Sequence, residues 1–411
     1  MRLSKSTKQA TILYITTILG TVLGVLASVI NTRSLSPESY GDVRYVNNLI
    51  GFISGLLLLG YFTSGSRLLA LAKSKQEAKE IKGSMLLVLL VTIIGLIILL
   101  IVCFLVHRFW LHRDFSYLFL YIIPVCYSSI LLNYINTSSM GDNSISTIAM
   151  ARLMPHLLYV IVSVFLYSII PVTNSVVLIL QNGIAVLVLV SLICYNGFSF
   201  TNLRCRIRNL QEENSQYGLH VYLGSLFTLS VPYLAGVSLG VFNLNNTLVG
   251  FYSLALSMTT PLGLVPNVIG TTFYKRFALQ DRIEQRVLVF TFAISIVTLA
   301  IFSVLIFPLV DILYDDAYST VAIYACFLGI GALIHGLGDV FYRFLGAHGK
   351  GKEIRNVSVL VGVISIIGYT LGVYIWGINA AIVTRILVGC IYCIGMYCYY
   401  HMIFVSNHEK V

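Results

Sequence analysis

The chain has 411 residues, of which 58% are hydrophobic and only 10% are charged. Soluble globular proteins carry about 45–50% apolar and about 25% charged residues, so this composition cannot supply a water-exposed surface. The sequence therefore excludes a soluble enzyme, a nucleic-acid-binding protein and a disordered scaffold. The net charge of +10 indicates membrane topology and lipid or substrate electrostatics, with no nucleic-acid partner.

Long apolar segments recur along the whole chain. A helix needs about 20 apolar residues to cross about 30 Å of hydrocarbon. Twelve segments meet this length, and they predict an all-α integral membrane protein: 10–31, 40–65, 84–106, 115–136, 144–170, 175–197, 218–241, 247–273, 287–307, 320–344, 357–376 and 379–404. The first segment follows basic residues, as a signal peptide does, but its length and the lack of a cleavage site favour a retained span.

The basic residues are distributed unevenly between the two sets of loops. One set holds 20 Lys and Arg residues, and the other holds only Arg33, Arg108 and Arg113. Because Lys and Arg accumulate in cytoplasmic loops, both termini are predicted to be cytoplasmic. The loops on the other side are all short, so no extracytoplasmic domain is expected.

A polar stretch at 198–217 divides the chain nearly in half. It predicts an N-lobe at 1–197 with spans one to six, a cytoplasmic linker at 198–217 and a C-lobe at 218–411 with spans seven to twelve. An offset of 209 residues places Gly41 on Gly250 and Arg67 on Arg276. Six spans per lobe give both halves the same orientation, so a pseudo-two-fold axis along the membrane normal and alternating access by rocking lobes are expected.

Three arginines fall inside spans, where an ionisable group costs at least about 2.5–3.5 kcal/mol and marks a cavity unless it snorkels to the surface. Arg152 lies about 12 Å into its span, at 1.5 Å per residue, and His156 follows on the same helix face. This depth favours a water-filled cavity over a structural contact. Arg385 lies about 9 Å deep, and both interpretations remain open for it.

Arg44 lies roughly one turn below the extracytoplasmic edge, near Asn47 and Asn48. Snorkelling of its guanidinium to the membrane surface explains this position nearly as well as function does. Arg44, Asn47 and Asn48 join Arg152, His156 and Arg385 as candidate residues of a cationic substrate cavity.

His335, Asp339 and Arg343 share one face of the tenth span, near its cytoplasmic end. An aspartate and an arginine one helical turn apart can form an ion pair, which neutralises both charges and has a purely structural role. A carboxylate beside a histidine is also what an ion-coupled carrier requires. Structural pairing is the favoured interpretation, and ion coupling through these residues is the alternative.

Signals for other chemistry are weak. Cys390 and Cys393 form a C-x-x-C in the middle of a span and are interpreted as inert thiols. The segment G-A-H-G-K-G-K at 346–352 lacks the phosphate-loop pattern and its strand–helix context. No nucleophile–base constellation or metal-ligand cluster is present, so neither an enzyme nor a cofactor is predicted.

Short motifs carry a family resemblance. Residues 33–41 read R-S-L-S-P-E-S-Y-G, 59–70 read L-G-Y-F-T-S-G-S-R-L-L-A, 248–255 read L-V-G-F-Y-S-L-A and 273–277 read F-Y-K-R-F. Together with length, span number and linker position, they resemble the Wzx-type O-antigen flippases of the multidrug/oligosaccharidyl-lipid/polysaccharide (MOP) exporter superfamily. The resemblance implies two six-helix lobes around a central cavity in a bacterial inner membrane.

The resemblance also implies a substrate, an oligosaccharide on undecaprenyl pyrophosphate. A glycan polymerase and chain-length proteins are candidate partners. A multidrug or cation antiporter of the same superfamily is the first alternative, although cation carriers prefer embedded acidic residues. A membrane glycan polymerase or ligase is the second, although such enzymes usually present sizeable extracytoplasmic loops.

Overall fold

A computed structural model describes residues 5–229 and 231–405 of the chain. The described residues form helices and connecting turns and contain no β-strand. Internal contacts divide the chain into two compact units, unit 1 (Met1–Tyr233) and unit 2 (Leu234–Val411). The all-α membrane fold expected from hydropathy is therefore confirmed.

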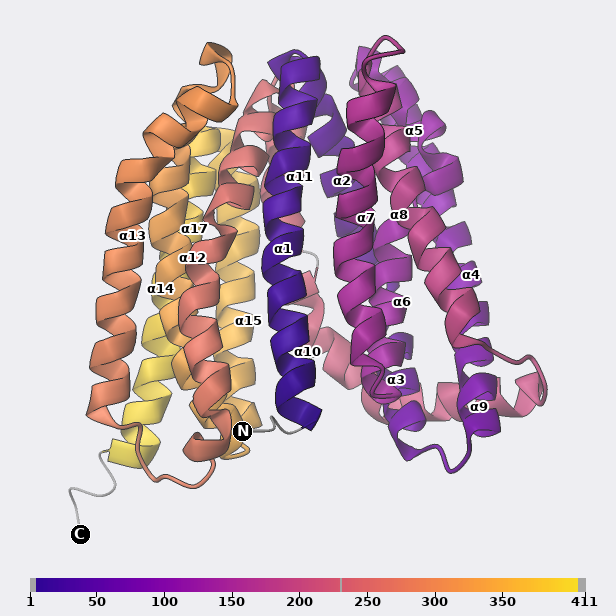
Figure 1. Cartoon of the computed structure of the whole chain (residues 1–411), viewed down its shortest axis with the longest axis vertical. Coiled ribbons are helices and arrows are strands. Elements are labelled where there is room, and N and C mark those ends of the chain that lie inside the picture. Colours follow the sequence, from indigo (N-terminus) through magenta and orange to yellow (C-terminus); the bar gives the residue numbers. More distant parts are fainter. Residues whose placement is uncertain (1–4, 230, 406–411) are drawn as a thin grey trace. The chain divides into compact units, whose positions relative to one another are not determined.

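Unit 1 is a bundle of long helices with shorter connecting helices. Its elements are α1 (Lys5–Ser34), α2 (Pro37–Leu57), α3 (Tyr61–Leu71), α4 (Lys75–Leu105), α5 (Leu118–Tyr121), α6 (Ser128–Gly141), α7 (Ile145–Leu166), α8 (Asn174–Asn196), α9 (Leu203–Glu213) and α10 (Leu219–Leu229). Helix α1 packs along α7 (Figure 1). A Cβ atom at Gly20 of α1 would lie 3.2 Å from the carbonyl oxygen of Arg152 in α7, so glycine permits this close approach.

Unit 2 is organised around its most buried helix. Its elements are α11 (Val231–Phe242), which crosses the division between the units, α12 (Thr247–Phe277), α13 (Gln285–Leu313), α14 (Thr320–Ala347), α15 (Gly351–Ile367), α16 (Val373–Trp376) and α17 (Ile378–Tyr400). Helix α14 packs against both α12 and α17. Close packing at one end of the unit comes from a buried cluster that includes Phe277, Phe344 and Met396.

The predicted spans are mostly single helices, with two corrections. Nine helices of the described chain are long and apolar enough to cross a membrane, or up to eleven if each bent pair counts as one span. The segments predicted as spans at 40–65 and 115–136 are each formed by two helices that bend by 60° and 43° at a break, so each is a broken span or a re-entrant loop. Leu59 and Gly60 have φ values of 46° and 83°, which a right-handed helix cannot accommodate. The predicted span 218–241 is divided between α10 and α11, and residue 230 lies outside the described residues.

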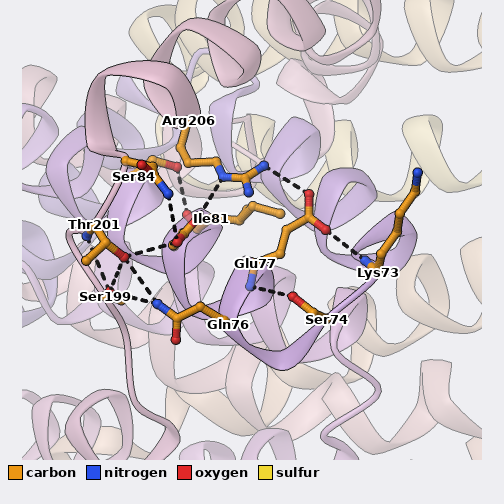
Figure 2. Close-up of polar contacts among 11 residues, drawn as sticks. Lys73, Ser74, Gln76, Glu77, Ile81, Ser84, Ser199, Thr201 and Arg206 are labelled. Carbon is orange, nitrogen blue, oxygen red and sulfur yellow. Dashed lines mark hydrogen bonds and ion pairs between the residues drawn. The ribbon is translucent and has the colours of Figure 1, made fainter.

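The polar stretch 198–217 is not an extended linker. It contains α9, which packs on α3 and α4 within unit 1. Figure 2 shows Arg206 of α9 between Glu77 and the neighbouring turn of α4. The two compact units divide between Tyr233 and Leu234, so both the stretch and α10 belong to unit 1. The predicted division at 1–197 and 218–411 into lobes of six spans stays a prediction. Arg2 and Lys410, two of the counted charges, lie outside the described residues.

The break between α2 and α3 gives a stability prediction. Gly60 has φ 83°, and a Cβ there would lie 2.4 Å from the carbonyl oxygen of Gly218. Gly60→Ala should therefore lower the free energy of unfolding by about 2–5 kcal/mol. Part of this loss comes from placing alanine in a left-handed conformation, and part comes from the overlap of its Cβ with the backbone of Gly218. A lower midpoint of thermal unfolding in detergent measures this loss.

Gly349→Ala is the matched control for Gly60→Ala. Its φ is 70°, but no heavy atom lies within 4 Å of the added Cβ. Gly349→Ala should lower the free energy of unfolding by only about 1–2 kcal/mol, because alanine is strained in a left-handed conformation but meets no neighbouring atom. Equal shifts of the two midpoints would contradict the role given to the contact with Gly218.

Candidate functional site

Two arginines lie well inside the helices of unit 1. Arg44 and Arg152 each follow the first residue of their helix, Pro37 of α2 and Ile145 of α7, by seven residues, which is about 10 Å along the axis. The Arg152 guanidinium donates to Thr17 Oγ1 of α1 at 3.3 Å. The Arg44 guanidinium lies 5.7 Å from the ring centroid of Tyr40. Neither arginine forms an ion pair with a carboxylate of the described chain.

The other predicted residues of unit 1 surround these arginines unequally. His156 is half-buried, one turn after Arg152 and within Coulombic range of Arg44, so it lies near both positive charges. Asn47 accepts a hydrogen bond from Asn182 Nδ2 of α8 at 3.1 Å. Asn48 is half-buried. Arg44 and Arg152 are therefore the cations near His156, while Asn47 takes part in packing α2 against α8.

Arg385 of unit 2 lies among tyrosines. It follows the first residue of α17, Ile378, by seven residues. Tyr369, from the turn between α15 and α16, lies within hydrogen-bonding range of Arg385 and of Tyr252 in α12. The Nε atom of Arg385 is buried and has no hydrogen-bond partner in the described chain. Arg385 forms no ion pair with a described carboxylate.

Asp339 is held by neutral donors. Tyr392 Oη donates to Asp339 Oδ1 at 2.9 Å. Asn267 Nδ2 donates to Asp339 Oδ2 at 3.1 Å. Arg343 does not pair with Asp339, and its Nη2 donates instead to Asn267 Oδ1 at 3.5 Å. The direct Asp339–Arg343 ion pair that favoured a structural interpretation is therefore wrong, because the Asn267 side chain binds both residues.

His335 is near both polar groups of unit 2. Its ring stacks on Tyr392 with centroids 4.2 Å apart and planes at 13°. It lies within Coulombic range of both Arg385 and Asp339. His335 therefore lies between Arg385 and the Asp339–Tyr392–Asn267 group inside this unit, although its own Nδ1 atom is buried and has no hydrogen-bond partner in the described chain.

Several members of these two groups were not predicted from the sequence. Tyr369 and Tyr392 are two of 26 tyrosines, and no spacing distinguishes them. Asn267 follows Pro266 in α12, which is the only local signal for it. Tyr252 lies in the L-V-G-F-Y-S-L-A motif, so the motif that carries the family resemblance also marked a residue of the site.

A family and several solved structures are similar to this chain. The family described as polysaccharide biosynthesis protein matches residues 6–278. An inward-facing multidrug resistance MATE transporter of the MOP superfamily matches with a TM-score of 0.70 and 16% identity, over 95% of this chain and 96% of that chain. The lipid II flippase MurJ, in an inward closed conformation, matches with a TM-score of 0.70 and 12% identity, over 94% and 87%.

A further structure extends this set. The MATE transporter VcmN of Vibrio cholerae, in its bent form, matches with a TM-score of 0.54 and 14% identity, over 99% of both chains. Curated protein sequences provide no match. At these identities the solved structures show the fold alone, which this chain shares with the MATE transporters and with MurJ.

Proposed function

The chain belongs to the polysaccharide biosynthesis protein family, and from this premise we propose that it flips an undecaprenyl-pyrophosphate-linked oligosaccharide across a bacterial inner membrane. The family match and the MOP fold confirm the resemblance seen in the sequence. The substrate is an O-antigen or capsule repeat unit, moved from the cytoplasmic to the periplasmic leaflet. Both termini lie in the cytoplasm.

One observation supports this substrate above others. Arg44, Arg152 and Arg385 lie inside membrane helices and form no ion pair with a described carboxylate. A positive side chain inside the membrane that has no carboxylate partner costs free energy, and such side chains usually mark a substrate or ion pathway. A pyrophosphate–sugar headgroup is anionic and strongly hydrated, and guanidinium groups bind phosphate oxygens in bidentate geometry. Each of these arginines can therefore contact the headgroup during its passage, while the polyprenyl tail stays in lipid.

Energy for the cycle comes from an ion gradient in this proposal. Asp339 accepts hydrogen bonds from Tyr392 and Asn267 and has no cationic partner of its own. Such a carboxylate can take up a proton or a cation, whereas an ion-paired one is already neutralised. Alternating access then couples uptake at Asp339, with His335 and Arg343 nearby, to movement of the headgroup.

Complementation of a deletion strain tests the proposal. Wild-type protein should restore surface glycan, and its loss should leave lipid-linked oligosaccharide on the cytoplasmic leaflet. A glycan polymerase or ligase would change polymer length while leaving export intact. A multidrug antiporter, which the uncompensated Asp339 also suits, would extrude dye and leave the lipid-linked pool unchanged. Either of these results would reject the flippase.

The contact between Tyr369 and Arg385 gives a further prediction. Tyr369→Phe removes a hydroxyl that interacts electrostatically with Arg385, so the guanidinium loses a polar neighbour worth about 1 kcal/mol. The rate of glycan export should fall about fivefold, measured in the complemented strain at equal protein level. Tyr374→Phe is the matched control, because Tyr374 is 70% exposed in the same connection. An equal effect of both substitutions would contradict the role of Tyr369.

A further inference from the structure

Helix α9 lies crosswise against the lower ends of α3 and α4 at one end of unit 1 (Figure 1). Arg206 fastens it, since its Nε donates to Glu80 Oε2 at 3.0 Å and its Nη1 to Glu77 Oε1 at 2.9 Å (Figure 2). Burial alone would lower the pKa of Arg206, but its bonds to Glu80 and Glu77 raise that pKa above its usual value. Arg206 thus docks α9 on α4.

The opposite face of α9 is free and has a distinct chemistry. Its residues line an open groove of about 520 Å³: Leu203, Arg204, Ile207, Arg208 and Gln211. Two guanidiniums therefore lie beside two aliphatic side chains at helical spacing. Arg204 forms no ion pair with a described carboxylate, and the contact between Arg208 and Glu212 at 2.9 Å joins side chains that are 81% and 56% exposed. Such an exposed pair is weak and can give way to a stronger anion.

Helix α9 begins close to the end of a candidate membrane span. Helix α8, a candidate span, ends at Asn196, and six residues separate it from α9. Tyr195 in the last turn of α8 and Phe200 in the connection are 85% and 53% exposed. Aromatic side chains concentrate at the level of the lipid headgroups, where their rings meet both apolar and polar surroundings. A helix that lies crosswise at this level contacts headgroups with one face and the protein with the other.

We propose that the α9 groove binds the headgroup of an anionic phospholipid. Arg204 and Arg208 contact the phosphate, and Leu203 and Ile207 contact the glycerol and the first methylenes of the acyl chains. The three arginines of R-C-R-I-R thus have two different roles. Arg206 binds α4 and docks the helix, while Arg204 and Arg208 line the groove on the other face. This site is separate from the proposed transport residues, and its occupant is a resident lipid of the membrane.

Binding of phosphatidylglycerol by the full chain in detergent tests the proposal, with native mass spectrometry as the measurement. The double variant R204Q/R208Q removes both groove charges and leaves Arg206 in place, so α9 stays docked. Its affinity for phosphatidylglycerol should be about tenfold lower, since each basic residue near an anionic surface contributes measurably to attraction. Phosphatidylcholine should bind wild type and variant equally and weakly.

The double variant K73Q/K75Q is the matched control, because it removes the same charge from exposed positions near the same end of unit 1. It should bind phosphatidylglycerol as wild type does. Equal losses in both double variants would overturn the proposal in favour of diffuse attraction. Unchanged binding in R204Q/R208Q, as expected if a cytoplasmic protein occupies the groove, would also overturn it. So would glycerol 3-phosphate competing as well as phosphatidylglycerol, because the groove would then serve a soluble phosphate.

Discussion

Replacing Arg152 by alanine is expected to abolish surface glycan while the protein remains at its normal level in the membrane. Arg152 is half-buried, and its one hydrogen bond to a described residue goes to Thr17. Its guanidinium therefore retains donors for a phosphate. Removing one partner of a desolvated, hydrogen-bonded charge pair costs about 2–5 kcal/mol, so export should slow by at least about thirtyfold. Glycan display and the cytoplasmic pool of lipid-linked oligosaccharide are the two measurements.

Two companion substitutions make the Arg152 result specific. Arg152→Lys keeps the charge but loses the planar fork, so it should restore only part of the export. Arg286→Ala removes an exposed arginine at the start of α13 and should leave export unchanged. Normal glycan display in the Arg152→Ala strain would remove Arg152 from the substrate site.

The substitution Asp339→Asn is expected to stop transport with little change in stability. Asparagine has the shape of aspartate, and its carbonyl oxygen can still accept the hydrogen bond that Tyr392 donates at 2.9 Å. The amide nitrogen that replaces Oδ2 can no longer accept from Asn267 Nδ2, which costs about 1 kcal/mol. The negative charge is lost as well, and with it the capacity to take up an ion. Export should fall to the level of the deletion strain, while the midpoint of thermal unfolding in detergent stays within a few degrees of wild type.

A structural role for Asp339 predicts a different pattern. Export per folded molecule would then be normal in Asp339→Asn, and that outcome would refute ion coupling at this residue. Asp311→Asn supplies the control, because Asp311 is an exposed carboxylate near the end of α13 and forms no ion pair with a described residue. It should change neither export nor stability.

Local sequence was a good guide to the helices and a poor guide to their breaks. The span predicted at 247–273 corresponds to α12 (Thr247–Phe277), because an apolar helix satisfies its own backbone and needs no partner to form. The bend between α2 and α3 was missed, since it depends on the positive φ of Leu59 and Gly60. Gly60 also lies against Gly218, a contact across more than 150 positions of the chain that hydropathy does not report.

The candidate site shows the same division. Arg44, Arg152 and Arg385 were found from sequence because charge at membrane depth is costly wherever the helix packs. The partners of Asp339 were not, because Tyr392 and Asn267 come from two other helices. The spacing of Asp339 and Arg343 on one helix instead suggested a direct pair.

The sequence by itself determined that this chain is a multi-pass helical membrane protein, because hydrophobicity and charge act on each segment independently of the others. It also identified the arginines on which the proposed function depends. Only the tertiary structure decided that Asn267 contacts both Asp339 and Arg343, and that Arg206 docks α9 while Arg204 and Arg208 face outward. These facts depend on the directions of side chains after the helices have packed, and packing is a property of the whole unit.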